Sequence, residues 1–186
     1  MQISYETPRL LLRQFEYPDA GTVQNLAGHI EVARSTLNVP HPYEDGMAES
    51  WIGYLIKARV ARTEFTYAVI LKESGQLVGA SSIIYTEKHN RAELAYWVGV
   101  PYWKCGIGTE AAAVLLTGCF ESLPVVKVFA AHFLENTASG RIMEKLGMKR
   151  EGILRSHFSR WNRQVDSVYY GILRNEWEEK SGSKRS

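Results

Sequence analysis

The sequence has little cysteine and no long apolar run, and its charges do not favour one sign. Only two cysteines are present, Cys105 and Cys119, which is too few for a disulfide framework, and their spacing matches no zinc site, so no metal site is expected. No apolar stretch approaches the roughly 20 residues that a membrane-spanning helix needs. The opening MQISYETPRLLLRQF also lacks the pattern of a signal peptide. We therefore expect a cytoplasmic protein without a membrane anchor.

The charge balance is close to neutral, with 22 basic and 20 acidic residues and a net charge of +2. This balance gives no reason to expect nucleic acid or a membrane surface as a partner. The composition, 45% hydrophobic and 23% charged, is that of a globular protein, and 186 residues suit one domain. We predict a single domain over residues 1–179 and a disordered tail over residues 180–186. The oligomeric state, monomer or homodimer, is left open.

Apolar periodicity predicts alternating strands and helices along the chain. A strand over Leu10–Phe15 leads into a helix within PDAGTVQNLAGHI, for which Asp19 is the expected N-cap. A second helix is expected over Met47–Arg59. Three strands joined by short turns then predict an antiparallel meander, and they cover Phe65–Leu71, Leu77–Tyr85 and Ala92–Val100.

The second half of the chain alternates helices with strands. The strand–helix–strand unit over residues 92–134 is expected to be a parallel, right-handed crossover. The whole order, β-α-α-β-β-β-α-β-α-β-β, predicts an α/β fold with a mixed sheet and a ligand beyond the carboxyl end of the third meander strand. The remaining elements are a helix from about Gly106, a strand over Val125–Leu134, a helix over Thr137–Leu146 and two strands over Met148–Phe158 and Val165–Leu173.

The stretch VGVPYWKCGIGTEAAAVLL places two glycines and a lysine between a strand and a helix. The first N–H groups of a helix are unpaired and carry positive partial charge. Gly106 and Gly108 leave these groups uncovered, and Lys104 adds a positive charge, so the loop fits a diphosphate. An ordinary glycine-containing turn explains the spacing equally well. A dinucleotide-binding fingerprint fits less well, because the third glycine that it requires is missing.

A second segment, LENTASGRIMEKLGMKREG, places Asn136 at a helix N-cap, Ser139 one turn inside and Gly147 at the C-cap. Together with YWVGVPYWKCGIGTEA, it resembles the GCN5-related N-acetyltransferases (GNAT), above all the RimJ/RimL type that acetylates the amino termini of ribosomal proteins. The resemblance extends from ETPRLLLRQF to VYYGILRNEW. It implies the GNAT fold with a splayed mixed sheet, acetyl-CoA as co-substrate and an amine as acceptor.

The resemblance also implies roles for individual residues. In this family, a Gln/Arg-x-x-Gly-x-Gly/Ala signature holds the diphosphate of coenzyme A, and the matching residues here begin at Trp103, which departs from the Gln or Arg of the pattern. The strand at Tyr96 would pair its backbone with the pantetheine arm, and Asn136 and Ser139 would line the thioester end. The residues expected to bind the coenzyme are Tyr96, Trp97, Val98, Lys104, Cys105, Gly106, Ile107, Gly108, Thr109 and Asn136.

Acetyl transfer to an amine requires a neutral amine, a stabilised oxyanion and, in some cases, a proton for the thiolate. Glu93 is our candidate base, and a solvated strand carboxylate or an ion pair explains this residue equally well. The N–H of Val98 is our hypothesis for the oxyanion. Weaker candidates for the base are His132, His89 and Glu135, of which His132 interrupts an apolar strand as a core histidine would.

Ser139 is the candidate acid, with helix capping as the alternative reading, because Met143 stands where many relatives have a tyrosine. A thiolate leaves readily without help, since the pKa of a free thiol is about 8.5. Cys105 has the surroundings of a reactive thiol, beside Lys104 at a helix start, but bound phosphates would separate it from the acetyl group. We therefore expect no catalytic cysteine.

These observations favour an N-acetyltransferase that works by direct transfer in a ternary complex, with a protein N-terminal amine of the ribosomal-protein type as acceptor. A small-molecule amine (a polyamine, an amino sugar or an antibiotic) is the alternative within the same chemistry, and the lack of a dense acidic cluster disfavours polyamines. A non-catalytic sensor of acyl-CoA is the alternative from another class, because Trp103 and Met143 depart from the family pattern.

Overall fold

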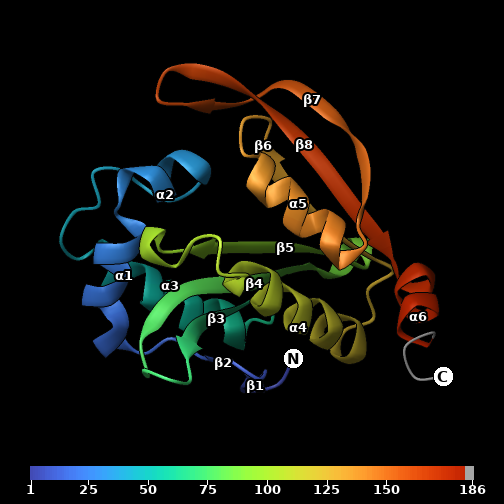
Figure 1. The fold of residues 1–186 in the computed structure, drawn as a ribbon, viewed down its shortest axis with the longest axis horizontal. Helices are drawn as coiled ribbons and strands as arrows, with labels where there is room; N and C mark the ends of the chain where they lie inside the picture. Colours follow the sequence, from blue (N-terminus) through green and yellow to red (C-terminus); the bar gives the residue numbers. More distant parts are fainter. Residues whose placement is uncertain (183–186) are drawn as a thin grey trace.

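An eight-stranded mixed sheet forms the centre of the computed structural model, which describes residues 1–182 (Figure 1). The strands follow the order β1-β2-β3-β4-β5-β6-β8-β7. Among the described strands, β5 and β6 are the parallel neighbours, and the other pairs are antiparallel. The strands are β1 (Tyr5–Glu6), β2 (Leu10–Arg13), β3 (Glu64–Leu71), β4 (Leu77–Thr86), β5 (Arg91–Val98), β6 (Lys127–Phe133), β7 (Lys149–Arg160) and β8 (Arg163–Leu173).

Helices cover both faces of the sheet, and each face has its own buried core. Helices α1 and α3 pack on one face, against β3 and β4, whereas α4 and α5 pack on the other (Figure 1). Strand β3 is buried on both sides, which explains why apolar and aromatic residues follow one another without a break from Tyr67 to Leu71. The helices are α1 (Ala20–Ala27), α2 (Ile30–Ser35), α3 (Met47–Val60), α4 (Ile107–Ser122), α5 (Thr137–Leu146) and α6 (Arg174–Gly182), with 3-10 turns η1 (Tyr17–Asp19), η2 (Glu87–His89) and η3 (Val100–Tyr102).

The observed architecture confirms the predicted α/β fold with a mixed sheet. The antiparallel meander β3-β4-β5 and the parallel unit β5-α4-β6 are both present. Helix α5 has the predicted bounds, with Asn136 at its N-cap and Gly147 at its C-cap. The elements that the sequence did not predict are β1, α2 and α6, of which β1 and α2 are too short to show a clear period.

The amino-terminal helical region differs from the prediction at two points. A single helix extending to Ile30 was expected, but α1 ends at Ala27 with Gly28 as its C-cap. Helix α2 starts after His29, whose Nδ1 accepts a hydrogen bond from the N–H of Glu31. Asp19 occupies the predicted N-cap position of α1, but its side chain makes no capping hydrogen bond there. This carboxylate instead accepts hydrogen bonds from the Arg13 guanidinium at 2.7 and 2.8 Å, so it ties the start of α1 to β2.

The prediction of a disordered tail from residue 180 is wrong for residues 180–182, because they belong to α6. This helix is held at its start, where the Arg174 guanidinium donates hydrogen bonds to the carbonyls of Phe120, Leu123 and Val125 at 2.8–2.9 Å. The Trp177 ring also stacks on Phe120, with ring centroids 5.1 Å apart. The rest of the predicted tail, residues 183–186, lies outside the described residues.

Candidate functional site

Strands β5 and β6 separate at the point where the resemblance implies a splayed sheet. They pair only where Arg91–Glu93 faces Lys127–Phe129. Strand β5 nevertheless stays paired with β4 as far as Val98. The stretch from Leu94 to Val98 therefore has backbone groups on the β6 side that no described strand of the sheet pairs. We call the opening beside this stretch the splay.

The backbone of Val98 faces the splay. The N–H of Gly99 donates to the carbonyl of Val78 on β4, at 2.8 Å. Because successive backbone groups of a strand alternate in direction, the N–H and C=O of Val98 point away from β4. Its carbonyl accepts a hydrogen bond from the Trp103 indole N–H at 2.6 Å, so Trp103 lies beside the carboxyl end of β5.

The loop after β5 presents a continuous row of backbone donors. Within residues 1–182, none of the backbone N–H groups from Lys104 to Thr109 donates a hydrogen bond. Gly106 is the N-cap of α4 and adopts a left-handed conformation with φ of 79°, and Lys104 is also left-handed with φ of 62°. The row therefore combines unpaired amides at a helix start with the positive charge of Lys104, as predicted from the sequence.

The two glycines of this loop serve different purposes. At Gly106 the positive φ favours glycine, and a Cβ would lie 3.3 Å from the Arg9 guanidinium. Gly108 is buried, and a Cβ there would lie 3.2 Å from Ile142 Cδ1 and 3.6 Å from Val98 Cγ2. Gly108 thus allows α4 to approach α5 and β5 closely, a reason that the sequence did not reveal.

A pair of hydroxyl groups joins β5 to the first turn of α5. The Tyr96 hydroxyl lies 2.9 Å from Ser139 Oγ and donates to the Ser139 carbonyl at 3.2 Å. Burial raises the pKa of Tyr96 to about 12. The Asn136 side chain accepts from the N–H of Ser139 and donates to the Ser35 carbonyl of α2, each at 3.2 Å. Asn136 therefore caps α5 and ties this helix to α2.

Glu93 projects from the opposite face of β5. Ala92 and Leu94 belong to the core under α4, and side chains alternate along a strand, so Glu93 lies on the other face, together with Trp97. Glu93 is half-buried, and burial raises the pKa of its carboxyl, with an opposing effect from Arg91 and a smaller raising effect from Glu64. The structure thus places Glu93 on one face of β5, beside the splay. Ser139 lies on the opposite face of this strand, where it contacts Tyr96.

Aromatic side chains that the sequence did not assign to the site lie near Glu93. The Glu93 charge contributes to a raised pKa of Tyr169, after burial as the main cause. The Tyr169 ring stacks on Phe129 with centroids 6.3 Å apart, and its hydroxyl lies 3.2 Å from His157 Nε2. Tyr170 is buried in the core, and side chains alternate along β8, so Tyr169 points to the opposite face of the sheet. This alternation is the only sequence signal that could have indicated Tyr169 as a residue near the site.

The other candidate residues are not placed for the same chemistry. His132 is buried under α5, and its Nδ1 lies 2.8 Å from the Phe133 carbonyl, as a core histidine would. Glu135 is exposed and pairs with Arg163 at 3.4 Å, and His89 lies in the exposed turn η2. Met143, which is 1% exposed, belongs to the core. Within residues 1–182, no group of three or more His, Cys, Asp or Glu side chains could hold a metal ion.

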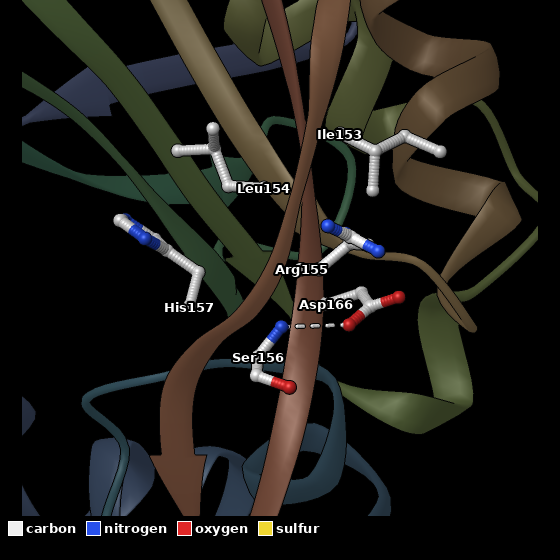
Figure 2. A pocket seen from close by; sticks show the side chains of 6 residues that line it. All are labelled: Ile153, Leu154, Arg155, Ser156, His157 and Asp166. Atoms are coloured by element: carbon white, nitrogen blue, oxygen red, sulfur yellow. Dashed lines mark hydrogen bonds between the residues drawn. The ribbon is translucent and has the colours of Figure 1, made fainter.

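A hollow of about 680 Å³ lies on the β7–β8 hairpin (Figure 2). It forms where β7 bulges, and the N–H of Ser156 donates to Asp166 Oδ1 at 2.8 Å across the hairpin. The residues that line it are Ile153, Leu154, Arg155, Ser156, His157 and Asp166, none of which was predicted to take part in binding or catalysis.

No helix among residues 1–182 is long and apolar enough to cross a membrane.

Comparisons with known proteins agree with this geometry. The family model of the acetyltransferase (GNAT) domain matches residues 9–149. YnaD of Bacillus subtilis, an N-acetyltransferase without a characterised role, is 28% identical over 171 residues, covering 92% of this chain and 97% of YnaD. YdaF of the same bacterium, provisionally named a ribosomal N-acetyltransferase, is 33% identical over 105 residues, covering 56% of this chain and 57% of YdaF.

A solved structure shows the same likeness over the whole fold. The crystal structure of an acetyltransferase (GNAT family) from Bacillus anthracis has a TM-score of 0.82 and 27% sequence identity. The match covers 93% of this chain and 99% of that chain.

Proposed function

The chain belongs to the acetyltransferase (GNAT) family, whose members use acetyl-CoA as the acetyl donor, and we propose that it acetylates a protein N-terminal amine by direct transfer. The observation that carries this proposal is the position of the splay, between the unpaired amides of α4 and the carboxylate of Glu93. An acetyl group at this point would meet a base on one side and hydroxyl groups on the other.

The residues at this end of the sheet fit coenzyme A. The N–H groups from Lys104 to Thr109 would donate to the diphosphate, assisted by the Lys104 charge and the dipole of α4. The unpaired edge of β5 from Leu94 to Val98 would run along the pantetheine arm, because its amides face outward from the sheet there. The Trp103 indole, which now donates to the Val98 carbonyl, would form one wall of this path.

The two faces of β5 divide the chemistry. The bound thioester supplies the acetyl group; the C–N bond to the acceptor forms and the C–S bond breaks. Glu93 would take a proton from the acceptor amine on its face of β5. The N–H of Val98, which points into the splay, would donate to the carbonyl oxygen as negative charge develops there.

The hydroxyl pair on the far face would serve the leaving sulfur. A phenol with a pKa of about 12 stays protonated opposite a thiolate, for which the ordinary pKa is about 8.5. Tyr96 and Ser139 would therefore donate hydrogen bonds to the thiolate and would not transfer a proton to it completely. This role replaces the simple acid that the sequence indicated for Ser139.

The carboxylates near the site support an acceptor with a single amine. Glu64 lies in the same cross-strand row as Glu93, because both pair with Ile84 of β4. However, Glu64 already accepts hydrogen bonds from Thr66 at 2.6 Å and from Tyr54 at 3.0 Å. Glu93 is thus the carboxylate of this row for which no hydrogen bond from residues 1–182 is seen, and we expect a polyamine site to offer several such carboxylates. The name given to YdaF agrees with an acceptor of the ribosomal-protein type.

A panel of acceptors tests the proposal. The protein is incubated with acetyl-CoA and with peptides that have a free N-terminus, the same peptides blocked at the N-terminus but containing lysine, spermidine and an aminoglycoside, while free thiol is followed. We expect thiol release with the free N-termini alone. Release with spermidine or the aminoglycoside would favour a small-molecule acceptor, and binding of acetyl-CoA without release from any amine would favour a sensor.

A further inference from the structure

An ion pair between residues far apart in the sequence fastens the diphosphate loop to the amino-terminal hairpin. The guanidinium of Arg9, between β1 and β2, donates to Glu110 Oε2 from Nε at 2.7 Å, and its Nη2 lies 2.6 Å from the same oxygen. The second carboxylate oxygen accepts from the N–H of Arg9 at 3.2 Å and from the Thr7 hydroxyl at 2.5 Å. Glu110 lies in the first turn of α4, directly after the row of unpaired amides.

The same guanidinium reaches the loop itself. Arg9 Nη1 donates to the carbonyl of Cys105 at 3.0 Å, in the middle of the row. A carbonyl fixed in this way holds its peptide plane, so the adjoining N–H of Gly106 points away from Arg9. We call Thr7, Arg9 and Glu110 the hairpin clamp.

The charges of the clamp also bear on an anion bound at this place. The Glu110 carboxylate lies at the start of α4, where it would repel a diphosphate. Arg9 neutralises this charge through a fork of donors, a geometry that lysine does not offer. Burial alone would raise the pKa of Glu110, but hydrogen bonds from Thr7 and Arg9 lower it, so the carboxylate stays charged at neutral pH.

We infer that Arg9 is a positioning residue, which sets the amides of the loop for the diphosphate through Cys105 and Glu110. The inference rests on the proposed function, because it takes the row from Lys104 to Thr109 as the diphosphate site. Arg9 acts by preorganisation, because it orders the loop before the ligand binds. The entropic cost of ordering the loop then no longer weakens the affinity for the ligand. The clamp therefore favours ligands that carry the diphosphate over shorter ligands that contain the pantetheine arm alone.

The test compares the affinities for coenzyme A and for pantetheine, which lacks the diphosphate, by calorimetric titration and competition. The ratio of the two dissociation constants is measured for the wild type, Arg9→Ala, Arg9→Lys and Glu110→Gln. We expect the preference for coenzyme A to fall about tenfold or more in all three variants, the loss typical of a charge-assisted hydrogen bond. A loss of folded protein alone would not change this ratio.

A matched control is Glu6→Gln, which removes the 2.7 Å ion pair between the same hairpin and Lys72 but leaves the loop untouched. This variant should keep the wild-type ratio. Glu110→Gln distinguishes the ordering of the loop from simple charge attraction to the diphosphate. If charge alone mattered, removing the negative charge of Glu110 would strengthen binding of the diphosphate. A higher preference for coenzyme A in Glu110→Gln would therefore overturn the inference.

The same titrations test the positioning role of Arg9 and the diphosphate site separately. If the wild type prefers coenzyme A and the Arg9 variants keep that preference, the clamp has no positioning role but the diphosphate site stands. If the wild type binds pantetheine as tightly as coenzyme A, the site itself is wrong, and the inference is overturned with it.

Discussion

The hydroxyl groups of Tyr96 and Ser139 lie 2.9 Å apart, one on β5 and the other on the first turn of α5. Because β5 borders the splay and Tyr96 links it to the start of α5, we place the pair at the end of the proposed path of the thioester. Glu93, the proposed base, lies on the other face of β5.

Removing either hydroxyl should slow transfer without weakening the binding of acetyl-CoA. We expect Tyr96→Phe and Ser139→Ala each to lower kcat about tenfold, the effect of one hydrogen bond to a charged group, with KM for acetyl-CoA nearly unchanged. Since the two groups act as a pair, the double variant should lose little more than either single one. Steady-state kinetics of the three variants test this expectation, and additive losses would contradict the paired role.

Glu93→Gln should abolish most of the activity and change its pH dependence. Burial raises the pKa of this carboxyl, so the acidic limb of the kcat/KM profile should lie above the ordinary glutamate value of about 4.3. The limb should disappear in the variant. If the variant keeps the wild-type profile, Glu93 is not the base.

The same substitution should stabilise the fold at neutral pH. A carboxyl with a raised pKa in the folded state favours its neutral form, so its contribution to the free energy of unfolding is present at low pH and is lost as the pH rises through the folded pKa. Glu93→Gln should accordingly raise Tm at pH 7, and the gain should vanish below about pH 4. Thermal unfolding at several pH values measures this difference, and a lower Tm at pH 7 would argue against burial as the cause of the raised pKa.

Lys104→Gly should separate the conformation of the loop from its charge. Lys104 has φ of 62°, a region that costs a non-glycine residue roughly 1–2 kcal/mol. Glycine should therefore stabilise the protein by about 1 kcal/mol, a rise in Tm of about 2–4 °C, while the lost charge weakens the binding of coenzyme A. Lys104→Arg is the matched control, because it keeps the charge and the strain. Unchanged affinity in Lys104→Gly would exclude a contribution of this charge.

The sequence predicted the local geometry of the candidate site where its determinants are neighbours along the chain. The unpaired amides beside Gly106 follow from a helix start, and the Asn136 cap follows from the spacing to Ser139. Strand alternation already places Glu93 and Tyr96 on opposite faces of β5. The sequence could not show that both lie beside the splay, because that depends on where β6 leaves β5. The contact of Arg9 with Glu110 was equally hidden, since it joins residues about a hundred positions apart.

The position of β7 and β8 shows a further limit of local patterns. The alternation of apolar and polar residues predicted both strands. It could not predict that Tyr169 lies beside Phe129 and Glu93, or that Tyr170 packs in the core, because these contacts depend on the tertiary fold. The bulge that forms the hollow of Figure 2 depends on the left-handed conformation of Ser156, which its residue type does not indicate.

We propose that the backbone amides at the start of α4 bind the diphosphate and direct the thioester into the splay. A titration of the uniformly ¹⁵N-labelled protein with coenzyme A, followed by the amide resonances, tests this directly. We expect large shifts for the amides of Lys104 to Thr109 and for that of Val98. Coenzyme A that binds while these resonances stay in place would contradict it.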